Sequence, residues 1–269
     1  MSFPISRLKR NVWISELALG LAYELNKYDP VKNPKNDAIG ARYACYFNYS
    51  IGGRYALNRE MDLLYALDLT HMSNGRMSQP NYGLNMVGIN LGMRYHFNKL
   101  QRKNNPGSRP DIIWDVRPSY SQKPDTTMRS FKESNFLFYV AGGFSQNFED
   151  KGTNLRYFNG TGTIEYQRFF HLKHAAVLGL DFFYDGNMLG FDQEPFEIGY
   201  HLGYDYKIWR YTLRLQAGGY IMAPKGKGVF YMRPALKYDI SKRWYAQVGL
   251  KTRSGFVADW MEWGIGFRL

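Results

Sequence analysis

The chain has 269 residues, of which 45% are apolar and 17% are aromatic, and its formal net charge is +12. It contains no run of about 18 apolar residues, which excludes an encoded transmembrane helix. A single cysteine, Cys45, excludes an internal disulfide and gives no pattern of metal ligands.

Most of the chain alternates between apolar and polar side chains with a period of two, which indicates β-strands with one apolar face. The clearest run is 196–208, where Tyr200, Leu202 and Tyr204 share a face. No helix is predicted. In chain order the pattern predicts strands at 12–25, 39–57, 61–73, 84–97, 135–148, 158–170, 176–184, 196–208, 211–221, 230–240, 244–252 and 259–269.

The connections between these strands alternate in character. Four short turns lie at 58–60, 171–174, 209–210 and 241–243. Loops that are mostly longer and polar lie at 27–37, 74–83, 150–157, 187–195 and 224–228. Short turns at one end and long loops at the other are typical of an outer-membrane β-barrel with both termini in the periplasm. The long basic segment 98–132 departs from this rule, because strand order places it at the periplasmic end, and connections of this length are usually functional or disordered.

We therefore predict an all-β protein in the bacterial outer membrane: a single antiparallel transmembrane β-barrel over residues 1–269, with about 12 strands and a periplasmic-side insertion at about 98–132. A mean hydropathy of −0.46 is compatible with this fold, because barrel strands are only half apolar. The opening ten residues have no apolar signal core, so we expect that a leader has been removed. The alternative is a soluble barrel or sandwich. It is disfavoured because a single core would have to bury the Tyr-, Phe- and Leu-rich faces of all twelve strands.

The polar faces of the strands predict a polar, closed lumen. Charges of both signs favour a cross-linked interior over an ion-selective pore, which disfavours a porin. The net charge suits contact with lipopolysaccharide phosphates, although excess Lys and Arg in solvated loops explains it equally well. Nucleic acid is excluded as a partner because an outer-membrane protein has no access to it. The predicted inward residues are Glu16, Arg42, Asp62, Asp68, Arg94, Glu165, Asp181, Glu197, Asp205, Lys207, Arg214, Arg233 and Lys237.

Three polar side chains interrupt an apolar face at the loop end of the hairpin 61–97: His71, Ser73 and Asn85. Residues two apart on a strand share a face at a spacing of about 6.6 Å, so His71 and Ser73 can meet, and strand pairing would bring Asn85 beside them. A histidine that accepts the serine proton, itself held by a third group, makes the hydroxyl a nucleophile. Solvated polar residues at the membrane interface give the same pattern, so both interpretations stay open here.

The surrounding residues carry a family resemblance. His-Met-Ser-Asn-Gly at 71–75, then Gln-Pro-Asn at 79–81, Gly83 and Asn85, resemble the signature of the lipid A 3-O-deacylase family, whose broader relatives are acyloxyacyl-hydrolase-like barrels. Those outer-membrane enzymes remove an ester-linked acyl chain from lipid A with a Ser-His-Glu triad on the outer barrel surface.

The resemblance implies roles for individual residues. His71 would be the general base, Ser73 the nucleophile and Asn85 the third member of the triad, with Asn74 and Gly75 at the oxyanion hole. It also implies lipid A in the surrounding outer-membrane lipid as the substrate, with no metal and no cofactor.

Asn85 departs from the family pattern, because an amide can orient the histidine but cannot stabilise an imidazolium by charge. No nearby carboxylate replaces it: Asp68 has the wrong parity, and Glu60 and Asp62 lie at the far end of the strand. The alternative function is therefore a non-catalytic subunit or scaffold of an outer-membrane assembly, with a protein partner at 98–132. Hydrogen bonds from His71 to both Ser73 and Asn85 would favour the enzyme.

Overall fold

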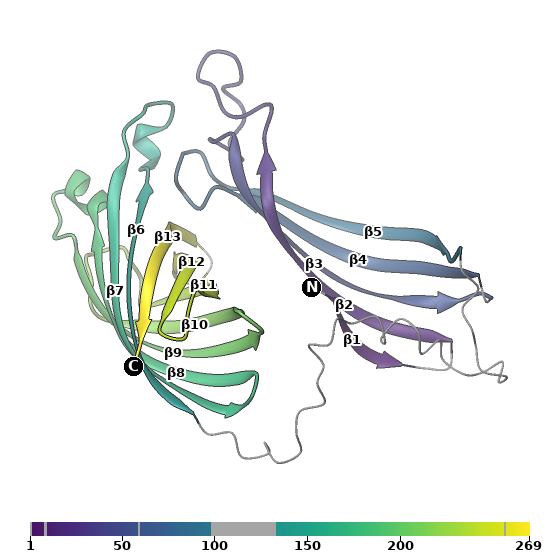
Figure 1. The fold of residues 1–269 in the computed structure, drawn as a ribbon. Coiled ribbons are helices and arrows are strands. Elements are labelled where there is room, and N and C mark those ends of the chain that lie inside the picture. Colours follow the sequence, from purple (N-terminus) through teal and green to yellow (C-terminus); the bar gives the residue numbers. More distant parts are fainter. Residues whose placement is uncertain (1, 8–9, 59, 98–132, 256) are drawn as a thin grey trace. The chain divides into compact units, whose positions relative to one another are not determined.

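The computed structural model describes residues 2–7, 10–58, 60–97, 133–255 and 257–269 (Figure 1). Nearly all regular structure in these ranges is antiparallel β-sheet, and the described part of the chain has no helix long and apolar enough to cross a membrane. Two short 3-10 helices, η2 (Phe148–Asp150) and η3 (Gly186–Phe191), lie in loops.

Eight consecutive strands close into a barrel, and β13 pairs with β6 to complete the ring (Figure 1). Every neighbouring pair is antiparallel, as alternating strands joined in sequence require. The strands are β6 (Ser134–Ser145), β7 (Tyr157–His171), β8 (His174–Asp185), β9 (Phe196–Ile208), β10 (Tyr211–Met222), β11 (Phe230–Asp239), β12 (Trp244–Arg253) and β13 (Val257–Arg268).

The N-terminal strands form a separate five-stranded antiparallel sheet in sequence order. Its strands are β1 (Ser2–Arg7), β2 (Asn11–Tyr23), β3 (Tyr43–Ala56), β4 (Met61–Ser73) and β5 (Leu84–Tyr95). The twelve predicted strands are all present, with ends that differ by a few residues, and β1 is an additional strand.

The predicted number of strands in the barrel was wrong, because eight strands close and not about twelve. Alternation along one strand shows which face is apolar, but it does not show which distant strand supplies the last pairing. The insertion at 98–132 lies outside the described residues, and the assignment of residues 1–269 to a single domain stays a prediction.

The chain groups into two compact units. One contains the sheet β1–β5. The other contains the barrel β6–β13 together with two loops that leave the sheet, Asn26–Ala41 and Asn74–Asn81. These two loops therefore pack with the barrel, although the strands that flank them belong to the sheet.

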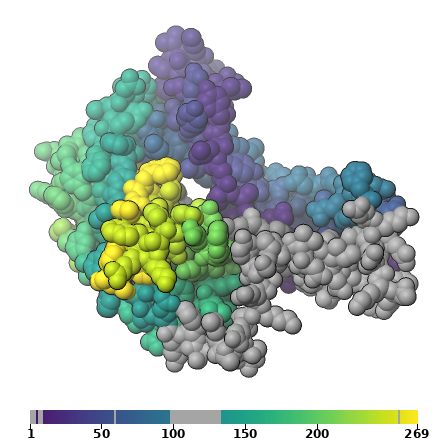
Figure 2. All heavy atoms as spheres, in the orientation of Figure 1, coloured from purple at the N-terminus to yellow at the C-terminus, as the bar shows by residue number. Residues whose placement is uncertain are grey.

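The outer surface of the barrel, part of which faces the viewer in Figure 2 (green to yellow), is apolar and exposed. Phe136 is 55% exposed, and Leu202 is 66% exposed, while the residues between such positions are buried. This alternation of apolar outward and polar inward residues is the pattern of a barrel that faces lipid. Other exposed apolar residues on these strands are Phe138, Val140, Ile164, Leu178, Leu180, Tyr200, Leu215, Trp263 and Ile265.

The barrel interior is filled with paired charges, as predicted for the inward residues of β6–β13. Five other residues predicted to face the lumen do not lie in the barrel, because the strands that carry or adjoin them form the separate sheet: Glu16, Arg42, Asp62, Asp68 and Arg94. The Arg214 guanidinium donates to Asp205 at 2.7 and 2.8 Å and to Glu165 at 2.6 Å. Arg233 bridges Asp181 at 2.7 Å and Glu262 at 2.9 Å. Buried charges are tolerated only when they are paired and hydrogen-bonded, so these contacts cross-link the strands through the lumen.

Candidate active site

Strand pairing builds the polar cluster at the end of the β4–β5 hairpin. β4 and β5 run antiparallel with His71 opposite Asn85, and β3 lies on the other side of β4 with Phe47 opposite His71 and Cys45 opposite Ser73. His71, Ser73 and Asn85 therefore share one face of the sheet, because the side-chain period of a strand is two. The alternation in the sequence predicted this shared face for the three residues.

The side chains of this cluster are hydrogen-bonded to one another. Ser73 Oγ lies 2.9 Å from His71 Nε2, and His71 Nδ1 lies 2.7 Å from Asn85 Oδ1. An amide oxygen only accepts hydrogen bonds, so Nδ1 carries the proton and donates to Asn85. Nε2 then presents its lone pair to the Ser73 hydroxyl. This tautomer is the one in which a histidine can act as a general base toward serine.

Exposure decreases from the orienting residue to the hydroxyl. Asn85 is exposed, His71 is half-buried, and Ser73 keeps only 8% of its surface accessible. Packing therefore restricts the rotamers of the hydroxyl and of the imidazole, which holds the pair in one geometry.

Gly83 closes one side of the cluster. It adopts a positive φ of 75°, and a Cβ atom there would lie 2.9 Å from the Met72 carbonyl oxygen and 3.0 Å from His71 Cε1. A glycine is required on both counts, because other residues disfavour this backbone conformation and because the imidazole occupies the space of a side chain. Gly83 is part of the sequence signature that resembles the deacylase family, which gave it no role. Its close approach to His71 shows that it leaves space for the imidazole.

The two carboxylates of β4, Asp62 and Asp68, are engaged elsewhere. Ser50 donates to Asp68 on the opposite face of the sheet, and Asp62 contacts His96 at 2.9 Å and Arg54 at 3.5 Å. Asn85 is thus the residue that holds Nδ1 of His71.

The loop Asn74–Asn81 follows Ser73 directly and has a defined conformation. The Asn74 N–H donates to Asn81 Oδ1 at 2.9 Å, and its side-chain amide donates to the Ser78 carbonyl at 2.9 Å. Gly75 and Arg76 both have positive φ, 61° and 68°. The role of Asn74 and Gly75 as oxyanion-hole donors stays a prediction.

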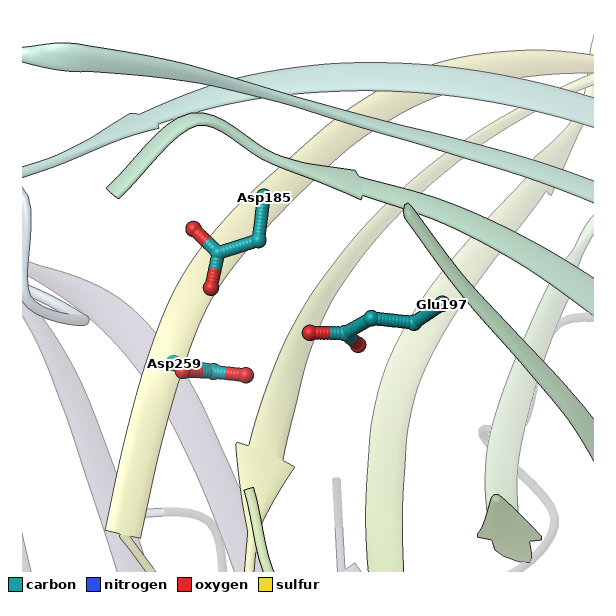
Figure 3. A group of neighbouring side chains, drawn as sticks. All are labelled: Asp185, Glu197 and Asp259. Carbon is teal, nitrogen blue, oxygen red and sulfur yellow. The ribbon is translucent and has the colours of Figure 1, made fainter. Parts of the chain in front are cut away.

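A cluster of three carboxylates lies inside one end of the barrel, where Asp185, Glu197 and Asp259 converge (Figure 3). Their oxygen atoms lie within 4.8 Å of one another, the spacing of a metal site. Two ammonium groups occupy this cluster: Lys227 and Lys251 each lie 3.0 Å from Glu197 and 2.7 Å from Asp259. The two lysines therefore balance two of the three carboxylate charges, and the cluster ties together the loop and strands that meet there.

Sequence reasoning missed Arg76, which contacts the same cluster. Its guanidinium donates to Asp259 at 3.2 Å and to Asn147 Oδ1 at 3.0 Å. The loop composition gave no local signal for this role, because the acceptor Asp259 is 183 residues away in the chain.

The fold and the cluster define an outer-membrane type of β-barrel protein that carries a hydrogen-bonded serine–histidine pair. Residues 1–94 match the family model described as lipid A 3-O-deacylase (PagL), and residues 134–269 match the model described as the acyloxyacyl hydrolase C-terminal domain. The chain belongs to this family. It is an outer-membrane protein with a lipid A deacylase-like function.

Other comparisons add little. No curated protein matches the chain. A solved structure titled "Asymmetric conductivity of engineered proteins" is 10% identical with a TM-score of 0.24, and it covers 94% of this chain and 100% of its own. A mutant porin of Rhodopseudomonas blastica is 10% identical with a TM-score of 0.23 over the same shares of the two chains. At these scores the likeness carries no inference about this chain.

Proposed function

We propose that the chain is an active serine esterase that hydrolyses an ester-linked acyl chain of lipid A. His71 Nε2 takes the proton of the Ser73 hydroxyl as Oγ attacks the ester carbonyl, and Asn85 holds the imidazole through Nδ1. Asn74 and Gly75 are the proposed oxyanion-hole residues; the Asn74 N–H donates to Asn81 Oδ1, so the donor that we propose is the Gly75 N–H. His71 then returns the proton to the leaving hydroxyl of the sugar, and water releases the acyl group from Ser73 by the same route.

One observation carries this proposal: His71 contacts Ser73 through one ring nitrogen and Asn85 through the other. Polar residues that are merely solvated at the end of a strand would hydrogen-bond to water, and nothing would fix the tautomer of the histidine between a serine and an amide. The cluster also lies on the apolar face of the hairpin, where Leu69 and Val87 are exposed. A lipid ester is the kind of substrate that reaches such a face.

A second candidate function is a non-catalytic subunit of an outer-membrane assembly. Asn85 favours it, because an amide cannot balance the charge of the imidazolium that forms during acyl transfer. The two candidates differ in whether Ser73 is needed for a chemical change in lipid A.

The test is mass spectrometry of lipid A from vesicles that contain the purified protein or its Ser73→Ala variant. We expect one acyl chain to be lost only with Ser73 intact. Ser15→Ala is a matched control, since Ser15 lies on β2 of the same sheet, and its hydroxyl donates to the Tyr49 hydroxyl and not to a histidine. If lipid A is identical with all three proteins, the esterase is refuted and the scaffold function is favoured.

A further inference from the structure

A cavity lies at the end of the barrel where the short turns join the strands, the end marked C in Figure 1. Its volume is about 800 Å³, within the range of small-molecule sites. The residues that line it come from around the start of β6, the ends of β9, β11 and β13, and the turns at 209–210 and 240–243. All of them belong to the compact unit that contains the barrel. Short turns of an outer-membrane barrel lie on the periplasmic side, so the cavity faces the periplasm.

The charged side chains that line this cavity are mostly basic. Five are basic and two are acidic, Glu133 and Asp239, so the side chains leave a surplus of three positive charges. A terminal carboxylate at Leu269 would reduce the surplus to two. A concave surface with one dominant sign of charge concentrates the electric field and attracts ions of the opposite sign. The five basic residues are Lys207, Arg210, Lys242, Arg243 and Arg268.

Two of the five cations are held in place by one carboxylate. Asp239 lies 3.0 Å from Lys207 Nζ and 3.0 Å from Arg268 Nη2. Arg268 also donates from Nη1 to the Lys242 carbonyl at 3.3 Å, which ties β13 to the turn at 240–243. These contacts join three strand ends and a turn, so this wall of the cavity is formed before any ligand arrives.

The other three cations are open to a ligand. Arg210, Lys242 and Arg243 are exposed, and within the described ranges none of them pairs with a carboxylate. Guanidinium groups bind phosphate oxygens through two parallel hydrogen bonds, and an ammonium group binds them as a point charge. A phosphate group carries enough negative charge and enough acceptor oxygens to contact several such cations at once.

We propose that this cavity binds a phosphate group from the periplasmic side, with Lys242 and Arg243 as its principal ligands. The volume exceeds what inorganic phosphate fills, so a phosphate carried on a small organic group, such as glycerol phosphate, is the class of ligand that fits. A free phosphate ester and the headgroup of a membrane phospholipid both supply this chemistry. The site is independent of the proposed esterase, since its residues include neither His71 nor Ser73.

The test uses the full-length protein in micelles of a sugar detergent, which carries no phosphate. Calorimetric titration with glycerol 3-phosphate measures binding of a free ester. Native mass spectrometry after addition of phosphatidylglycerol, with diacylglycerol as the lipid that lacks a phosphate, measures binding of a headgroup. We expect Lys242→Gln and Arg243→Gln each to weaken binding about tenfold, the lower end of what a hydrogen bond to a charged group contributes. Lys173→Gln is the matched control, because Lys173 is an exposed lysine of the turn between β7 and β8, at the same end of the barrel but outside the cavity lining.

The two measurements distinguish the sources of the phosphate. Binding of glycerol 3-phosphate that depends on Lys242 assigns the site to a free ester. Retention of phosphatidylglycerol but not of diacylglycerol, with the same dependence on Lys242 and no binding of glycerol 3-phosphate, assigns it to a lipid headgroup. If the wild-type protein binds neither ligand, or if Lys242→Gln and Lys173→Gln behave alike, the cavity is not a phosphate site.

Discussion

The residue that most affects the interpretation of the site is Asn85. Its side-chain oxygen accepts from His71 Nδ1 at 2.7 Å, so it fixes the tautomer that the reaction needs. It does not supply the negative charge that stabilises an imidazolium in a Ser-His-acid triad. The exchange of Asp for Asn lowers kcat by roughly 10⁴-fold in a serine protease, where the tautomer is also wrong. Here the tautomer is right, and only the charge is lacking.

Restoring the charge should therefore accelerate the reaction. We expect Asn85→Asp to raise kcat for lipid A hydrolysis by at least about tenfold, a modest part of the Asp-to-Asn difference in serine proteases. Asn85→Leu, of similar size without an acceptor, should lower kcat below the wild type. Single-turnover release of the fatty acid measures both effects. An Asn85→Asp protein that is slower than the wild type, with an intact barrel, would contradict a triad role for this position.

At the scale of the element, the β4–β5 hairpin shows what sequence can predict of a site. A period of two places His71, Ser73 and Asn85 on one face, and antiparallel pairing across the loop 74–83 brings them to one end, so pattern alone predicts the cluster. The contact of Gly83 with the imidazole depends on a local φ of 75°, which alternation does not encode. The contact of Arg76 with Asp259 joins residues that no local pattern relates.

The close fit of Gly83 against His71 gives a matched pair of variants in one hairpin. Gly83→Ala places a methyl group against the imidazole and the Met72 carbonyl, in a backbone region that costs roughly 1–2 kcal/mol for an L-residue. We expect kcat to fall by at least about tenfold as His71 is displaced, in line with the sensitivity of catalysis to small misplacements.

Gly88→Ala is the control, because the nearest atom to its added Cβ is Asp68 Cβ at 3.9 Å. The rate of lipid A hydrolysis is measured for both variants. The folding of each variant is checked by the change in its gel mobility on heating. Equal activity of Gly83→Ala and Gly88→Ala would show that Gly83 has no part in holding His71.

At the scale of the whole molecule, sequence predicted the strands and the mixed charges of the interior but not the closure. The pairing of Trp263 in β13 with Gly142 in β6 is a contact between strands far apart in the chain, set by the curvature and stagger of the sheet. Alternation is a local property, so it identifies strands such as 196–208 and their polar faces. It leaves open which strands share a ring, and so the barrel was predicted too large.

The ion pairs of the lumen should decide the stability of the barrel. Arg214 is fully buried against Glu165 and Asp205, so Arg214→Met leaves two carboxylates with reduced compensation, and removal of one partner of a buried pair typically costs about 3–5 kcal/mol. Arg210→Met, in the exposed turn between β9 and β10, removes the same group where water solvates it, and should change stability by less than about 0.5 kcal/mol. Urea unfolding from vesicles, followed by tryptophan fluorescence, measures the difference. Similar unfolding midpoints for the two variants would mean that the lumen network contributes little to holding the eight strands closed.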